Sequence, residues 1–316
     1  MGTFPRRSPN VFQERSIVTG SSSKKAVWVR RLPDLILAGP AVVIFVGLFV
    51  IPMMLAFVLS LTDWNGFSLN FTFVGFENYF AAFTGSRSIS AAMFTLFLSF
   101  IGTVLCNAVG LGLAVLISGQ GIANTIARTI FFYPFIISAL IIGFLWSAIL
   151  SPSGVVNNLL EQWGFSTAPF LTDGDWARGA VVFTVVWSAF GFSMILYIAG
   201  LKSIPVEYYE ASTIDGAGSW AQFCYITFPM LAPVVTVNLV LTVVGFLKIY
   251  DVVLALTNGG PAGSTQTVVY QILKESLENG RLGLGAAQSV ILLVVTAILG
   301  LAVVALRRRA EEKVSA

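Results

Sequence analysis

The side chains that most often carry out chemistry in proteins are scarce in this chain. The sequence has no histidine, and its two cysteines, Cys106 and Cys224, do not form a CxxC pair. Without histidine a Ser-His-Asp triad is impossible, and a zinc site is disfavoured. We therefore predict no metal site and no catalytic centre, and we expect both cysteines to be buried thiols. The residues with informative spacing lie in a polar segment, 202–232, between two apolar stretches.

The polar segment opens with the pattern of a helix N-terminus. Ser203 precedes Pro205, and Glu207 and Glu210 follow. A capping hydroxyl, a proline in the first turn and acids near the positive end of the helix dipole are typical of such a start. Gly216 would then allow a sharp change of direction. A first short helix that ends in a bend is therefore expected.

A second helix is predicted after the bend, over residues 219–226. Trp220, Phe223 and Ile226 would lie near one of its faces, and Pro229 would end it. The predicted result is a helix-turn-helix exposed at the membrane surface.

The charge of this helix-turn-helix favours a protein partner over lipid. Residues 207–229 include the acids Glu207, Glu210 and Asp215 and no basic residue. Helices that rest on anionic headgroups are usually rich in Lys and Arg, so docking to another protein is favoured. Asp215 could either cap the second helix or contact that protein.

Composition places the rest of the chain in a bilayer. Of the 316 residues, 56% are hydrophobic and 10% charged, whereas soluble domains carry about 25% charged residues. An apolar run of about 20 residues crosses the hydrocarbon core, and it must be helical to satisfy its backbone. We predict an all-α integral membrane protein with six transmembrane helices, at residues 35–61, 91–117, 130–150, 180–201, 233–256 and 286–306.

The basic residues are distributed unevenly about these spans. One side carries Arg6, Arg7, Arg15, Lys24, Lys25, Arg30, Arg31, Arg128, Lys202, Arg307, Arg308, Arg309 and Lys313. The other side carries Arg87, Arg178, Lys274 and Arg281. The positive-inside rule then places both termini and the 202–232 segment in the cytoplasm.

The ends of the chain are expected to be tails. Residues 1–31 read as a disordered basic cytoplasmic tail, because their basic region and the following apolar run are too long for a cleaved signal peptide. Residues 32–308 would form the transmembrane domain, and residues 309–316 a cytoplasmic C-terminal tail.

The spacing of the polar segment resembles the coupling motif of binding-protein-dependent ABC importer permeases, which is Glu-Ala-Ala, three residues, Gly, nine residues, Ile-x-Leu-Pro. The matching residues are Glu210, Ala211, Gly216, Ile226 and Pro229. Ser212 replaces the third motif residue, and Phe228 replaces leucine. The stretches TDW at 62–64, VGFENY at 74–79 and LTNGGP at 256–261 resemble the carbohydrate branch of the family, the maltose-type permeases. The similarity covers roughly residues 33–308.

The resemblance implies a specific machine in a bacterial or archaeal plasma membrane. Such a chain is not an enzyme and binds no cofactor, but it pairs with a second permease and with two cytoplasmic ATPase subunits that hold ATP and Mg²⁺. A solute-binding protein delivers the sugar, and no nucleic acid is involved. The chain has no G-x-x-x-x-G-K-[ST] loop of its own. The residues expected to couple it to the ATPase are Glu210, Ala211, Ser212, Asp215, Gly216, Ala217, Ile226 and Pro229.

The resemblance also implies a solute path through the spans. Its expected residues are Phe135, Ala139, Trp187, Ser188, Phe192, Thr242, Phe246 and Ile249. Aromatic faces with a few fixed polar groups suit a sugar, although plain helix packing would also explain each of these positions. Lys248 and Asp251 are three residues apart, so they could pair on one helical face, or one of them could face the path.

Three other functions are weighed against a sugar importer. The same machine could carry glycerol phosphate, which would call for cations in the path, and Lys248 is the one clear basic residue within a predicted span. A stand-alone ion-coupled carrier would call for intramembrane carboxylates and internal repeats, and only Asp251 lies clearly within a span. A polytopic membrane enzyme would need a cluster of acids or histidines at one depth, and none is visible.

Overall fold

The computed structural model describes residues 39–68 and 70–315. The predicted tail at 1–31 and the beginning of the first predicted span lie outside the described residues. Within the described residues the secondary structure is helical, apart from one isolated bridge between Thr62 and Phe73. The expected all-α class is confirmed.

The first span is a single apolar helix from Gly39 to Leu59. It contains a wide π turn, η1 (Val46–Val50), and continues as α2 (Ile51–Leu59). Its mean hydropathy is 3.0, and residues 39–59 contain no charged side chain. A helix of this length that is apolar on all sides is suited to the interior of a bilayer.

The turn after α2 explains why two of the motif stretches noted in the sequence occur together. The side-chain amide of Asn78 donates to the carbonyl oxygens of Ser60 (2.9 Å) and Thr62 (2.8 Å). The Asp63 carboxylate accepts from the backbone N–H of Thr72 (2.6 Å) and from its hydroxyl (2.7 Å). These bonds favour the ionised carboxylate, so they lower the pKa of Asp63. The two stretches hold one turn in place ahead of α3 (Glu77–Thr84).

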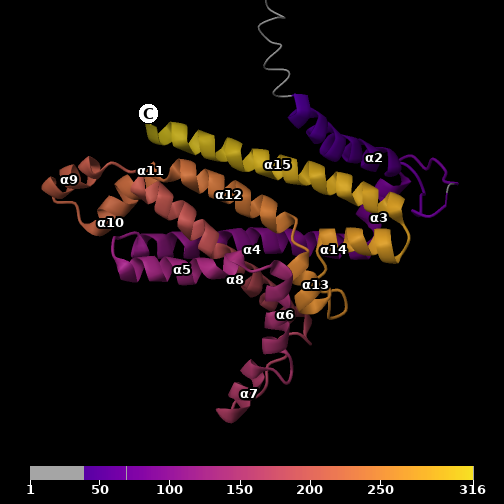
Figure 1. Ribbon diagram of the computed structural model, residues 1–316, viewed down its shortest axis with the longest axis horizontal. Helices are drawn as coiled ribbons and strands as arrows, with labels where there is room; N and C mark the ends of the chain where they lie inside the picture. Colours follow the sequence, from indigo (N-terminus) through magenta and orange to yellow (C-terminus); the bar gives the residue numbers. More distant parts are fainter. Residues whose placement is uncertain (1–38, 69, 316) are drawn as a thin grey trace, which may run out of the picture. The chain divides into compact units, whose positions relative to one another are not determined.

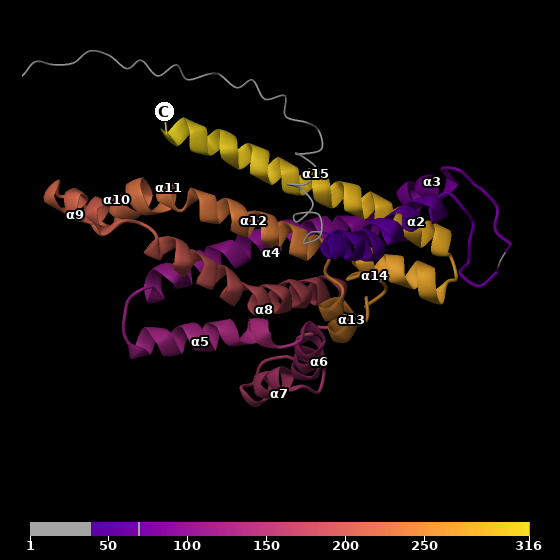
Figure 2. The same ribbon diagram turned by 45° about the horizontal axis from the view of Figure 1, so that its top comes forward.

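The core of the unit that begins at Leu55 forms where α4 (Ser86–Ile117), α8 (Gly174–Lys202) and α12 (Ala232–Leu247) pack together. Figures 1 and 2 show α4, α5 and α8 running alongside one another. Leu98, Val181 and Val185 are buried between these helices. Small residues permit close approach: a Cβ added at Gly110 would lie 2.7 Å from Ser193 Cβ.

The third predicted span, 130–150, is wrong as a single helix. The structure has α5 (Ile122–Ile136), then an extended Ile137 with ψ 140°, then α6 (Ala139–Leu150). Pro134 lies in the last turn of α5, and proline both lacks an N–H and disfavours continuation of the helix. The helical segment long and apolar enough to cross a membrane here is 139–162, which includes α7 (Val155–Gln162).

The fifth predicted span is also interrupted. Helix α12 ends at Leu247, and α13 (Asp251–Thr257) begins after a break at 248–250. The expected pairing of Lys248 with Asp251 is not found in the part of the chain that the structure describes, where the ion pairs are Arg178–Asp175 and Arg281–Glu275. The break removes the shared helical face on which that pairing depended, and both side chains are exposed.

The chain ends with α14 (Val268–Leu273), a π turn η3 (Lys274–Glu278) and the long α15 (Leu282–Ser315). Helix α15 packs against α12 and α14, and it continues past the predicted domain boundary at 308. Among the described residues, five helices are long and apolar enough to cross a membrane, or six if one bent pair counts as one span. This range includes the six spans predicted.

Candidate functional site

The polar segment between α8 and α12 folds as an elbow, residues 203–231, with two short arms. The first arm is α9 (Val206–Ile214), and the second is α10 (Ser219–Gln222), the π turn η2 (Phe223–Thr227) and α11 (Phe228–Met230). The second arm meets α12 at a bend of 66°. Figure 1 shows α9 and α10 at the end of α12 opposite to α13 and α14. The predicted helix-turn-helix is therefore present as a local structure.

Gly216 ends the first arm with a left-handed residue. Its φ is +80°, and its N–H donates to the carbonyl of Thr213 (3.1 Å) while the next N–H, from Ala217, reaches Ser212 O (2.9 Å). This pair of bonds is the Schellman motif, which satisfies carbonyls at a helix end. A Cβ at Gly216 would meet no atom within 4 Å. The glycine is thus required for backbone conformation and not for packing.

Side chains tie the two arms together. Gln222 donates its amide N–H groups to the hydroxyls of Ser212 (3.0 Å) and Thr213 (3.1 Å) across the bend. At the base of the arms, the hydroxyls of Tyr209 and Thr227 share a hydrogen bond of 2.9 Å. The elbow therefore has a defined angle. Ser212, which departs from the motif alanine, contributes one of these ties.

The capping role predicted for Ser203 is wrong, and the structure excludes capping as the role of Asp215. Ser203 lies at the C-terminus of α8 and bonds to Gly200 O (2.7 Å), while Pro205 is the residue before α9. Asp215 ends α9 and does not cap the second arm, whose first residue follows Gly218 without a side-chain cap. The Asp215 carboxylate is left exposed, as is that of Glu210.

The tip of the elbow presents apolar side chains to its surroundings. Ile214 is 87% exposed and Trp220 is 76% exposed. A hollow of about 470 Å³ at Ile214 is lined by Tyr209, Glu210, Thr213, Ile214 and Gln222. Ile226 and Pro229 are half-buried in the second arm. Exposed apolar residues beside uncompensated acids are typical of a protein-docking surface.

The predicted path residues fall into two groups. Phe135 and Phe192 stack with ring centroids 4.8 Å apart, and Trp187 lies edge-on to Trp146 at 5.4 Å. Ser188 bonds within its own helix to Val185 O. These side chains, with Ala139 and Ile249, keep partial exposure.

The second group is buried. Thr242 and Phe246 keep 7% and 6% of their surface exposed. Thr242 accepts a hydrogen bond from Asn107 (3.1 Å), and Phe246 packs over Gly102. Both residues hold α12 against α4 in this conformation. Their role in a path stays a prediction.

A buried polar network joins α4, α8 and α12, and the sequence analysis missed it. Asn107 Oδ1 accepts from Tyr197 Oη (2.6 Å) and from Asn238 Nδ2 (2.9 Å). Ser193 Oγ donates to Asn238 Oδ1 (3.2 Å) and lies 3.3 Å from Cys106 Sγ. A signal for this network was present in the sequence, because polar residues recur on three of the predicted spans. An isolated polar group in lipid costs free energy, so such residues are expected to pair with one another.

Replacing Asn107 with leucine is expected to destabilise the helix bundle by about 2 kcal/mol, because two buried donors lose their shared acceptor and each such bond in a membrane contributes about 0.6 to 1.7 kcal/mol. Thermal unfolding of the purified protein in detergent measures the effect. The matched control is Thr129→Val, because the Thr129 hydroxyl bonds only to a carbonyl of its own helix. Equal Tm values for Asn107→Leu and the control would contradict the assigned network.

Comparison with known proteins defines the class. Residues 107–315 match the family described as binding-protein-dependent transport system inner membrane component. The chain belongs to this family, and it is a multi-pass, all-α permease subunit of the ABC transporter class.

Two curated relatives show the range of cargo that their names record. The probable starch degradation products transport system permease AmyD of Thermoanaerobacterium thermosulfurigenes is 31% identical over 86% of this chain and 92% of the relative. The sn-glycerol-3-phosphate transport system permease UgpA of Brucella abortus is 31% identical over 86% of this chain and 93% of the relative.

A solved structure agrees in fold. A bacterial alginate ABC transporter, in complex with its alginate pentasaccharide-bound periplasmic protein, contains a chain with a TM-score of 0.79 and 26% identity. The match covers 90% of this chain and 98% of that one.

Proposed function

We propose that this chain is one permease of an ATP-driven importer that takes up a sugar released by a solute-binding protein. The observation that carries the proposal is the elbow, whose glycine bend and three side-chain hydrogen bonds between the arms hold an exposed tip. A separate ATPase subunit would receive that tip, with Ile214 as its apolar contact and Glu210 and Asp215 beside it. A second permease would complete the solute path, and the positive-inside distribution of charge supports an elbow in the cytoplasm.

The partly exposed aromatic side chains support a sugar as cargo. Sugars bind to the faces of aromatic rings with polar groups at the edge, and the Phe135–Phe192 stack and Trp187 offer such faces near Ser188. Similar proteins are named for the probable transport of starch degradation products and for the uptake of diacetylchitobiose. Glycerol phosphate is the second candidate, because Lys248 is exposed at the break before α13 and because relatives named for that cargo are similar to this chain.

Reconstituted uptake tests this function. The chain would be assembled with the second permease, ATPase and binding protein encoded beside it, and placed in proteoliposomes. We expect a labelled saccharide to accumulate only with ATP on the elbow side and binding protein on the other. Uptake driven by an ion gradient without ATP would contradict the proposal. Uptake of sn-glycerol 3-phosphate alone would establish the second candidate.

A further inference from the structure

Three basic side chains converge on one hollow at the end of α8 that lies away from the elbow. Arg87 is in the first turn of α4, Arg178 is near the start of α8, and Lys274 begins η3. All three line a cavity of about 790 Å³, which we call the cationic pocket. They are three of the four basic residues that the charge pattern assigns to this side of the membrane. Because they are far apart in the sequence, only the fold brings them together.

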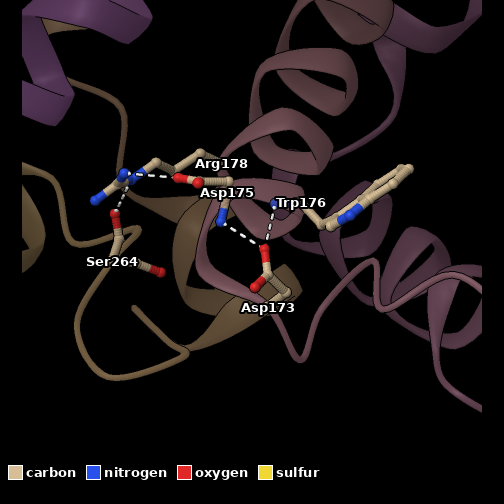
Figure 3. Close-up of polar contacts among 5 residues, drawn as sticks. All are labelled: Asp173, Asp175, Trp176, Arg178 and Ser264. Carbon is tan, nitrogen blue, oxygen red and sulfur yellow. Dashed lines mark hydrogen bonds and ion pairs between the residues drawn. The ribbon is translucent and has the colours of Figure 1, made fainter.

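Two acids, Asp173 and Asp175, lie at the cationic pocket and only partly offset its three cations. Asp173 is the acid among the lining residues, and one of its oxygens accepts from the backbone N–H groups of residues 175 and 176 at 3.0 and 3.2 Å (Figure 3). Within the described part of the chain, Arg87 and Lys274 form no ion pair. The pocket therefore carries a positive excess that can attract an anion.

Arg178 is held in place by two partners and keeps further N–H donors for other hydrogen bonds. Its Nε donates to Ser264 O (3.0 Å), and its Nη1 donates to the Asp175 carboxylate (3.0 Å). Figure 3 shows the guanidinium group between these two partners. The exposed ion pair contributes little stability in water. The contacts orient the guanidinium group and leave N–H groups for a ligand, since arginine carries five.

Hydrogen bonds fix the loop that lines one wall of the pocket. Thr265 donates to Gly260 O (2.7 Å), and its hydroxyl also lies 2.7 Å from that of Thr257. Tyr270 donates to Asn258 O (2.9 Å), and burial raises the pKa of Tyr270, so this donor stays protonated at neutral pH. These bonds fix the conformation of the loop at 258–265.

Hydroxyl groups complete the wall of the pocket. Ser86, Ser90, Thr172 and Ser264 line it together with the cations, and no aromatic residue does. The Ser264 hydroxyl is buried and has no partner among the described residues. A hydroxyl left unpaired in this way is available to a ligand. The volume of the cationic pocket, about 790 Å³, falls within the range of small-molecule sites.

We propose that the cationic pocket binds the carboxylate or phosphate group of a hydroxylated solute before that solute enters the membrane path. The cations would hold the oxyanion through charge-assisted hydrogen bonds, and the serine and threonine side chains would bond its hydroxyl groups. The absence of an aromatic face in the pocket disfavours a neutral sugar. This inference rests on the proposed function, and it adds a class of cargo, an acidic sugar or sugar-like phosphate.

Binding to the full chain in phosphatidylcholine nanodiscs tests the proposal. The probes are glucuronate against glucose, and sn-glycerol 3-phosphate against glycerol, followed by saturation-transfer NMR titration. We expect at least one anion to bind about tenfold or more tightly than its neutral counterpart, because hydrogen bonds to charged groups contribute more than neutral ones. The double variant Arg87→Gln, Lys274→Gln should lose that preference, and added salt should weaken it.

Arg281→Gln is the matched control. Arg281 is a cation on the same side of the membrane, but it contacts Glu275 at 3.6 Å and does not line the pocket. The control should keep the anion preference. Equal binding of both members of each probe pair, or an equal loss in the control, would overturn the proposal. So would loss of probe binding when phosphatidylglycerol replaces part of the lipid, because the pocket would then be a headgroup site. None of these results depends on uptake, so the proposed function is tested separately.

Discussion

Gly216→Pro is expected to leave the chain inserted in the membrane and to abolish solute-stimulated ATP hydrolysis by the assembled importer. Proline fixes φ near −65° and has no N–H. Gly216 has φ +80°, and its N–H donates to Thr213 O. The substitution therefore removes both features that close the bend, and the tip would lose its angle to the second arm. ATPase activity with and without the loaded binding protein measures the effect.

Gly218→Ala separates this effect from general sensitivity of the elbow. Gly218 lies two residues further on, but it has φ −75°, which any residue adopts, and a Cβ there would meet no atom within 4 Å. This control should keep normal stimulation. Normal stimulation in Gly216→Pro would instead remove the coupling role assigned to the bend.

Gly191→Ala is expected to destabilise the bundle by about 3 kcal/mol, a value near the top of the usual range for overpacking. A Cβ at Gly191 would be forced against the carbonyl oxygen of Phe131 and would lie 2.9 Å from the Cα of Phe132. Backbone atoms cannot move aside as a side chain can. Helices α5 and α8 would have to separate, which would also shift Phe192 on α8. The thermal unfolding temperature and the yield of inserted protein would both fall, and these two quantities are the measurements.

Gly179→Ala on the same helix is the control for this variant. A Cβ at Gly179 would meet no atom within 4 Å, and alanine is favoured over glycine inside a helix by about 0.5–1 kcal/mol. This control should unfold at the same temperature as the parent or slightly higher. Equal unfolding temperatures for Gly191→Ala and Gly179→Ala would contradict the close contact between α5 and α8.

Residue spacing predicted the helical class, most of the spans and the helix-turn-helix of the elbow. These features depend on long apolar runs and on one glycine at a fixed position, and both are local properties of the chain. The role of Gly216 could be read in advance because a left-handed residue at a helix end is usually glycine. The hydrogen bond from Gln222 to Ser212 could not be predicted, because it depends on the angle between the two arms.

The breaks within two predicted spans were hidden by their composition. Residues 130–150 are apolar throughout, so hydropathy does not reveal the extended Ile137 that follows Pro134. Lys248 and Asp251 were read as neighbours on one helical face, and the break between α12 and α13 places them on separate elements. The polar residues around Asn107 were visible within the predicted spans, but their pairing was not, because it depends on the packing of distant segments. The cationic pocket was hidden for the same reason.

Crosslinking from the tip of the elbow tests the central claim most directly. Ile214→Cys would be introduced into a chain that otherwise lacks Cys106 and Cys224, and the assembled importer would be treated with a short thiol-reactive photocrosslinker. The proposed function predicts one major product that contains the ATPase subunit, formed from Ile214→Cys and not from a cysteine at Ser264 near the opposite end of α8. Capture from Ser264→Cys alone, or no ATPase product from Ile214→Cys in a complex that hydrolyses ATP normally, would contradict it.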